Sequence, residues 1–301
     1  MRMKNKIKRT PSDIALDVIK VLFLAFAVVI CVYPFWNIFI VSINDANDAM
    51  RGGLYLLPRK LSLASYADIL GRSTFRHSIL VTVGRTLIGT PLAILVTSAL
   101  AYVLSRKELI GRRPLSVFFI FTMYFGGGMV PYYMVLKNLG LLDNFLVFIL
   151  PNLLSVYNMI LVRSYIESMP EALFDAARID AARIDGANDL VIFFRMVLPL
   201  CKPIIMTIAL FVAIGHWNSW FDAYLYTNSQ DLKTMQSILV EILNQYQTAD
   251  AGASAANRLS QAITPDSIRM AATMVTTIPI IMVYPFIQKY FVKGIMLGSV
   301  K

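Results

Sequence analysis

Six long apolar runs set the first constraint on how this chain can fold. A helix of about 20 residues crosses the roughly 30 Å hydrocarbon core of a bilayer, and each run reaches about that length. In lipid the backbone must satisfy its own hydrogen bonds, so apolar runs of this length span as helices. The runs predict an all-α polytopic membrane protein with six transmembrane helices, near residues 18–42, 78–104, 115–136, 146–164, 203–225 and 272–292.

The charged residues of the chain lie mostly at the ends of these runs. The sequence is 57% hydrophobic and 15% charged, with a formal net charge of +10. Nucleic-acid binding would need this positive charge on a soluble face, so we expect contact with membrane lipid and no nucleic-acid partner. Placing the even-numbered connections in the cytoplasm collects there Arg106, Lys107, Arg112, Arg113, Arg163, Arg178, Arg183, Arg195 and Lys202. By the positive-inside rule both termini are then cytoplasmic, although basic residues in the first outer loop weaken the count.

The first apolar run follows a basic N-terminus and ends in the aromatic sequence Val32-Tyr33-Pro34-Phe35-Trp36. A signal peptide would have a shorter apolar core and a cleavage site of small residues. Aromatic residues are instead typical of a membrane interface. We therefore expect a cytoplasmic tail at 1–17, an uncleaved first span, and a single transmembrane domain over 18–301.

A different pattern occupies the segment from Met169 to Asp189, which is rich in alanine and in charge. Ala and Arg favour a helix, Asp and Arg recur three residues apart, and Pro170 and Gly186 mark a start and an end. An apolar stripe beside the charged one indicates a helix that lies on a surface. A second helix is predicted from Leu190 to Val197, before Pro199. These properties fit both a solvated connection and a docking element.

The run from Pro170 through Gly186 to Leu198-Pro199-Leu200 resembles the EAA loop of permease subunits of ATP-binding-cassette importers. Its Ala-Ala-Arg-Ile-Asp-Gly-Ala is similar to the oligosaccharide-uptake branch, which includes the second maltose-importer permease and its polysaccharide and alginate-type relatives. The resemblance implies a type I importer permease fold whose loop at 165–202 carries a cytoplasmic coupling helix, seated in a cleft of an ATPase. The residues that it marks for ATPase coupling are Glu171, Asp175, Ala176, Ala177, Asp180, Ala181, Ala182, Asp185, Gly186 and Ala187.

One departure from the family pattern affects the register of this helix. Ala-Ala-Arg-Ile-Asp occurs twice in tandem, at 176–180 and 181–185, where the family has it once. Five extra residues lengthen a helix by about 7.5 Å and rotate its later residues by about 140° relative to its earlier ones. The family's acidic position falls on Asp175 when counted from Pro170 and on Asp180 when counted from Gly186. We hypothesise that the copy next to Gly186 docks.

The resemblance covers essentially the whole chain, including Tyr284-Pro285-Phe286 near the C-terminus. It implies a multi-pass protein of the bacterial inner or plasma membrane. The implied partners are a homologous second permease, two ATP-binding-cassette ATPases, an extracytoplasmic substrate-binding protein and an oligosaccharide. The chain contains no nucleotide-binding loop, so we expect no cofactor in this subunit, with ATP and magnesium in the partner ATPases, and no enzymatic activity of its own.

Several polar and aromatic residues within the spans are candidates for a substrate pathway or a binding-protein contact. Arg85 costs about 2.5–3.5 kcal/mol at a helix centre, and it fits either a polar pathway or a side chain that snorkels to the interface. The glycines at 126–128 predict a broken helix beside protein or water. Span four carries a polar face, for which hydrogen bonding between helices is the alternative role. The candidates are Arg85, Tyr124, Asn152, Tyr157, Asn158, Trp217, Asn218, Trp220, Asp222 and Tyr224.

The cluster from Trp217 to Tyr224 resembles a Trp-Asn-x-Trp-x-Asp/Glu stretch of the sugar permeases. Its aromatic rings and polar groups suit sugar binding, although such residues also form interfacial belts.

An ion-coupled carrier is the alternative from another class. It would need a relay of carboxylates inside the membrane, and the predicted spans contain few carboxylates besides Asp222. A permease for a non-sugar solute and a membrane enzyme also stay open, although His77 and His216 are too few for a metal or catalytic site. Whether the saccharide is acidic or neutral is undetermined.

Overall fold

The computed structural model describes residues 10–170, 189–250 and 264–299. Apart from a single bridge between Asn44 and Leu61, these residues form helices, turns and loops. The ten residues predicted for ATPase coupling, from Glu171 to Ala187, lie outside the described residues. The chain divides into two compact units, Met1–Ile69 with Tyr246–Val275 and Leu70–Gln245 with Thr276–Lys301.

The first unit begins with α1 (Pro11–Ser42), which starts seven residues before the predicted span. Thr10 and Asp13 form a capping box that satisfies the free backbone N–H groups at its N-terminus, and Pro11 occupies the first turn. The helix is long and apolar enough to cross a membrane, and no described residue of its most apolar stretch is buried. Because no polar stripe faces solvent, α1 is suited to lipid or to another transmembrane helix.

The loop after α1 folds back along the end of that helix. The ring nitrogen of Trp36 donates to the carbonyl of Leu56 at 3.0 Å, and Asn37 donates to the carbonyl of Leu54 at 2.7 Å. The loop contains α2 (Ala46–Ala49) and leads into α3 (Ala64–Gly71). Hydrogen bonds from Asn44 and Arg59 hold the pKa of Asp48 below its ordinary value. These contacts give the first loop a defined structure.

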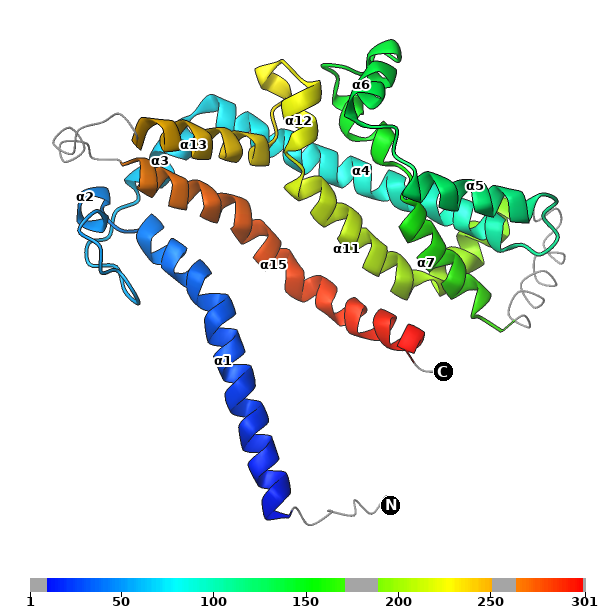
Figure 1. Ribbon diagram of the computed structural model, residues 1–301, viewed down its shortest axis with the longest axis horizontal. Coiled ribbons are helices and arrows are strands. Elements are labelled where there is room, and N and C mark those ends of the chain that lie inside the picture. Colours follow the sequence, from blue (N-terminus) through cyan, green and yellow to red (C-terminus); the bar gives the residue numbers. More distant parts are fainter. Residues whose placement is uncertain (1–9, 171–188, 251–263, 300–301) are drawn as a thin grey trace. The chain divides into compact units, whose positions relative to one another are not determined.

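The second unit is built around α4 (Ser73–Ser105), the predicted second span, which packs along α7 (Val156–Glu167) and α11 (Lys202–Asn218) (Figure 1). One end of this packing is a buried apolar cluster that includes Tyr102, Val162, Phe193 and Ile208. A second buried cluster lies around Phe148 and Ala223. The two clusters pack the three helices against one another. Polar residues of these helices lie between the two clusters.

The predicted third span is broken as expected. It consists of α5 (Arg112–Tyr124) and α6 (Met129–Asn138), bent by 115° at the glycine-rich break. Gly128 has φ +90°, a conformation that side chains rarely adopt. The predicted fourth span is similarly divided into η1 (Phe145–Phe148), η2 (Leu150–Asn152) and α7, with a 43° bend.

The structure corrects two predictions around the fifth span. The helix predicted for Leu190–Val197 is α9 (Asp189–Ile192) followed by a π-helical turn, η3 (Phe193–Val197), and it continues through Pro199 into α10 (Leu198–Leu200). In the π-turn the N–H of Leu198 donates to the carbonyl of Phe193, five residues earlier. Pro199, which follows, has no N–H to donate to the α-helical pattern. The span predicted at 203–225 is interrupted, because α11 ends at Asn218 and α12 spans Phe221–Tyr226.

After α12 come η4 (Gln230–Leu232), α13 (Met235–Asp250) and α15 (Pro265–Ser299). The last helix contains the predicted sixth span and extends it at both ends. Among the described residues, three helices are long and apolar enough to cross a membrane, and up to six spans result if each bent pair counts as one. The all-α class is confirmed, and the cytoplasmic position of the termini stays a prediction.

Candidate functional site

A cavity of about 430 Å³ lies inside the second unit, between α4, the segment around α7, and the broken helix α11–α12. Its volume falls within the range of about 300–1,000 Å³ that is typical of small-molecule sites. The aromatic residues of the wall are Tyr132, Phe211, Phe221 and Tyr226. The other polar residues of the wall are Arg85, Asn152, Ser155, Asn158, His216, Ser219 and Asp222.

Arg85 and Asp222 form an ion pair at this cavity. The two terminal nitrogens of the Arg85 guanidinium each donate to one carboxylate oxygen of Asp222, Nη2 to Oδ2 at 2.5 Å and Nη1 to Oδ1 at 3.2 Å. Arg85 is only 1% exposed, and its guanidinium carbon lies 4.6 Å from the centre of the Phe148 ring. The snorkelling interpretation of Arg85 is therefore wrong, because the side chain is enclosed by protein and neutralised by a carboxylate.

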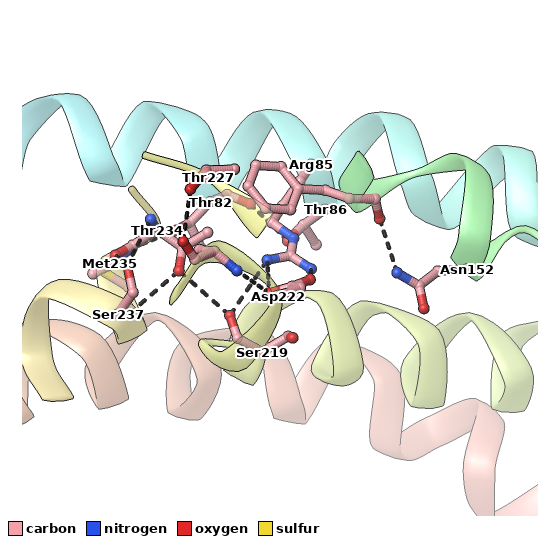
Figure 2. A network of polar contacts seen from close by, with 12 residues as sticks. Thr82, Arg85, Thr86, Asn152, Ser219, Asp222, Thr227, Thr234, Met235 and Ser237 are labelled. Carbon is pink, nitrogen blue, oxygen red and sulfur yellow. Dashed lines mark hydrogen bonds and ion pairs between the residues drawn. The ribbon is translucent and has the colours of Figure 1, made fainter. Parts of the chain in front are cut away.

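The break between α11 and α12 supplies part of this site. Ser219 is extended, which directs its carbonyl away from the helix, and that carbonyl accepts from Arg85 at 3.3 Å and from the hydroxyl of Thr234 at 3.4 Å. The hydroxyl of Thr82 on α4 accepts from the backbone N–H of Met235 at 2.8 Å. Figure 2 shows these contacts joining α4, the break and the start of α13 in one network.

Two further polar side chains line the cavity, Asn158 of α7 and His216 of α11. They are 6% and 4% exposed, respectively. Within the described part of the chain, neither side chain forms a hydrogen bond, and Nε of Arg85 is a buried nitrogen at this cavity that also lacks a partner. His216 also packs over Gly89, where an added Cβ would lie 2.6 Å from the Nε2 atom of the imidazole. The crossing of α4 and α11 thus sets the position of this ring.

The structure brings four of the predicted pathway residues together and separates the others. Arg85, Asn152, Asn158 and Asp222 line the polar cavity. Tyr124, Tyr157 and Tyr224 are exposed, and Trp220 packs against Phe221 and Tyr224. Trp217 donates to the carbonyl of Thr276 at 3.1 Å, and Asn218 accepts from Gln236 at 3.5 Å. The pathway role of all ten residues stays a prediction.

Sequence reasoning did not select the aromatic wall or the ring of His216. The helix breaks at Ser219, within the stretch from Trp217 to Tyr224, so residues that are adjacent in sequence lie on two different helices. The sequence offers no comparable signal for the aromatic wall or His216, whereas Arg85 and Asp222 are marked by isolated charges within apolar runs.

A second cavity, of about 360 Å³, has an almost entirely apolar wall that includes Leu87, Pro91, Trp217 and Ile280. Thr90 also lines it, and its buried hydroxyl has no hydrogen-bond partner in the described part of the chain. This wall offers nothing that would orient a polar solute. It contrasts with the polar cavity on the other side of α11.

Three arginines form ion pairs with acidic residues on either side of the undescribed part of the predicted coupling loop: Arg106 after α4, Arg112 at the start of α5 and Arg163 in α7. Arg112 donates to Glu167, the last residue of α7, and at 2.9 Å to the carbonyl of Leu104 near the end of α4. Arg163 also contacts Glu167, at 2.8 Å. Beyond the loop, Arg106 lies 3.4 Å from Asp189, the first residue of α9.

Comparisons with known proteins agree with this architecture. Residues 114–297 match the family described as binding-protein-dependent transport system inner membrane component. The chain is 39% identical to the polygalacturonan/rhamnogalacturonan transport system permease protein YtcP of Bacillus subtilis (strain 168), over 93% of this chain and 96% of that protein. It is 27% identical to the arabinooligosaccharides transport system permease protein AraQ of Halalkalibacterium halodurans, over 92% and 94% of the two chains.

A solved structure is similar over nearly the whole length. It is a crystal structure of a bacterial ABC transporter involved in the import of the acidic polysaccharide alginate. The matched chain is 30% identical with a TM-score of 0.83, and the alignment covers 95% of this chain and 100% of that one. The chain therefore belongs to the binding-protein-dependent transport system inner membrane components, as a multi-pass, non-enzymatic permease subunit of an ABC transporter that works with ATPase and substrate-binding partners.

Proposed function

We propose that this permease, paired with a homologous second permease, forms the conduit through which an oligosaccharide enters the cell. The observation that carries the proposal is the 39% identity to a polygalacturonan/rhamnogalacturonan permease, which extends over 93% of the chain. Relatives named for arabinooligosaccharides and for melibiose, raffinose and stachyose support the same solute class. ATP and magnesium belong to two partner ATPases, and this subunit holds no cofactor.

The proposed mechanism is alternating access. A loaded binding protein docks outside, the two ATPases close on ATP, and the coupling helix converts that closure into movement of the spans. The Arg112–Glu167 contact supports this transmission, because it ties the ends of α4, α5 and α7 together beside the coupling loop. The coupling residues are those predicted between Glu171 and Ala187, with Asp180 as the docking acid.

The paired state of Asp222 argues against the ion-coupled alternative. A carboxylate that carries protons or cations across a membrane has to release and rebind them during each cycle. Asp222 is held by both terminal nitrogens of Arg85 and also accepts from its own helix at the N–H of Ala223, 2.9 Å away. This arrangement favours a fixed, structural carboxylate.

The test is the ATPase activity of the complex, co-purified with its second permease, ATPases and binding protein, in lipid nanodiscs. The panel contains neutral oligosaccharides such as raffinose and arabinotriose, and acidic ones such as fragments of polygalacturonan and alginate. We expect one class to stimulate hydrolysis and to be taken up by proteoliposomes. Hydrolysis that no saccharide stimulates would contradict the sugar assignment and leave the permease assignment intact.

The docking register has its own test. Charge reversal by Asp180→Lys should lower saccharide-stimulated ATPase activity more than Asp175→Lys does, because the helix end predicted at Gly186 would fix the position of the copy beside it. A larger defect in Asp175→Lys would place the docking acid in the first copy.

A further inference from the structure

We propose that the polar cavity binds an uncharged, hydroxyl-bearing part of the transported saccharide and does not bind a carboxylate of it. This inference rests on the proposed function and specifies the chemistry of one site within it. Three independent properties of the cavity lead to it: unsatisfied hydrogen-bonding groups, a neutralised cation, and aromatic walls.

The first property is hydrogen-bonding capacity that the described protein does not use. The side chains of Asn158 and His216 are more than nine-tenths buried, line the cavity and form no hydrogen bond to any described residue. Both side chains face the cavity, so a ligand or water inside it can supply their hydrogen-bond partners. An amide offers both a donor and an acceptor, as does a neutral imidazole, and a sugar hydroxyl matches both.

The second property is the state of the cavity's cation. Arg85 is the only Lys or Arg side chain among the described residues that line the cavity, and its two terminal nitrogens are engaged by Asp222 and by the carbonyl of Ser219. The ring of Phe148 covers the guanidinium. The Nε of Arg85 has no partner among the described residues, but a uronate carboxylate placed there would lie beside the negative charge of Asp222, and like charges in a buried site repel. An uncharged ligand avoids this repulsion.

The third property is the aromatic part of the cavity wall. The rings of Tyr132 and Tyr226 are 5.9 Å apart and inclined at 55°, and Phe211 and Phe221 complete the wall. The C–H faces of a sugar ring are apolar and pack well on aromatic faces. Hydrogen-bonding groups on α7 and α11 would then contact the hydroxyls around the ring. If the saccharide is acidic, its carboxylates must be recognised elsewhere in the transporter.

The first arm of the experiment measures uptake by the complete complex in proteoliposomes. Asn158→Leu and His216→Leu remove hydrogen-bonding groups without adding charge, and Ile214→Ala is the matched control on the apolar side of α11. We expect each cavity variant to lower the uptake rate tenfold or more while ATPase stimulation by the loaded binding protein persists, and the control to behave as the wild type. Unchanged uptake in both cavity variants would overturn the proposal and leave the proposed function standing.

The second arm tests charge directly, without the binding protein. In a variant with Cys31 and Cys201 replaced by serine, Ser155→Cys places a thiol at the cavity for labelling by a small maleimide. Raffinose and methyl-esterified oligogalacturonate should slow labelling at least tenfold more than free oligogalacturonate at equal concentration. Equal or stronger protection by the free acid would overturn the neutral assignment, and protection by none of the three would overturn the site. Failure of the sugar function itself would appear separately, as absence of uptake for the whole panel.

Discussion

Arg85 and Asp222 are more informative as a pair than as separate residues. A buried ion pair has a desolvation penalty comparable to its attraction, so it stabilises little relative to apolar residues of the same size, whereas breaking it leaves a buried charge. Here the arginine is enclosed by protein and the partner carboxylate lies across the break between α11 and α12. The pair therefore specifies which helices meet.

This interpretation predicts strong non-additivity. Asp222→Asn should lower the stability of the purified subunit by about 3–5 kcal/mol, because it leaves Arg85 buried without its counter-charge. The double variant Arg85→Met/Asp222→Leu should recover most of that loss. Thermal unfolding in detergent measures both, and effects that simply add would show that the two charges act independently.

Thr90 provides a test of the apolar cavity. Its buried hydroxyl has no partner among the described residues, and an unsatisfied buried polar group costs about 1–3 kcal/mol. Thr90→Val keeps the shape of the side chain, so we expect it to raise the unfolding temperature of the subunit. A lower temperature would indicate that lipid or a partner subunit bonds this hydroxyl.

The residues of the site show what sequence can and cannot reveal. Arg85 and Asp222 stand out because charges in apolar runs are rare, and Asn152 and Asn158 because they lie on a polar face. The pairing of Arg85 with Asp222 depends on the contact between α4 and α12, which no local pattern encodes. His216 was passed over because an isolated histidine suggests neither a metal site nor catalysis, while its significance depends on Gly89 of another helix.

At the scale of elements, the crossing of α4 and α11 depends on a glycine. A Cβ on Gly89 would lie 2.6 Å from Nε2 and 2.8 Å from Cε1 of His216, so the ring would have to move. Gly84, which precedes it on α4, has only an ordinary contact of 3.7 Å with Phe145. Small residues of this kind allow helices to approach closely in a membrane.

Gly89→Ala should therefore destabilise the subunit by about 1–3 kcal/mol, the usual cost of overpacking, and should displace His216. Gly84→Ala is the matched control and should be neutral or slightly stabilising, because alanine favours a helix over glycine. Thermal unfolding and saccharide uptake are measured for both variants. Equal behaviour of the two would show that α4 and α11 do not cross at Gly89.

Helix breaks differ in how visible they are in the sequence. Three consecutive glycines predict the break between α5 and α6, because glycine weakens a helix wherever it occurs. The break at Ser219 has no such signal, since Trp, Asn and Ser are compatible with a helix. It is stabilised by donors from elsewhere, because Arg85 of α4 and Thr234 before α13 both donate to the carbonyl that the extended backbone of Ser219 leaves free.

At the scale of the whole molecule, the fold class follows from the apolar runs because a bilayer permits so few structures. Helices occur where the spans are predicted, with ends that differ by several residues in α1 and α15. The faces of the spans were harder to predict. A helix such as α1 is apolar on every side, so its sequence does not distinguish a surface for lipid from a surface for a partner subunit.

The contacts beside the coupling loop link three helices. Arg112 joins the end of α4 to the end of α7 through Leu104 and Glu167, and Arg163 holds Glu167 from within α7. The hydroxyl of Ser116 on α5 accepts from Arg163 at 2.7 Å. In the proposed importer, movement of the coupling loop would therefore reach α4, α5 and α7 together.

Glu167→Ala should loosen this linkage and separate ATP hydrolysis from transport. We expect binding-protein-stimulated ATPase activity to persist while the amount of saccharide imported per ATP falls several-fold, since the proposed ATPase contact is at residues 171–187 and the lost contact is at the end of α7. Glu167→Asp, which keeps a carboxylate near Arg112 and Arg163, should retain more of the ratio than Glu167→Ala. Asp266→Asn, which removes the carboxylate paired with Arg269 in α15, is the control and should leave the ratio unchanged. A parallel fall in hydrolysis and import in Glu167→Ala would instead assign this residue to ATPase docking.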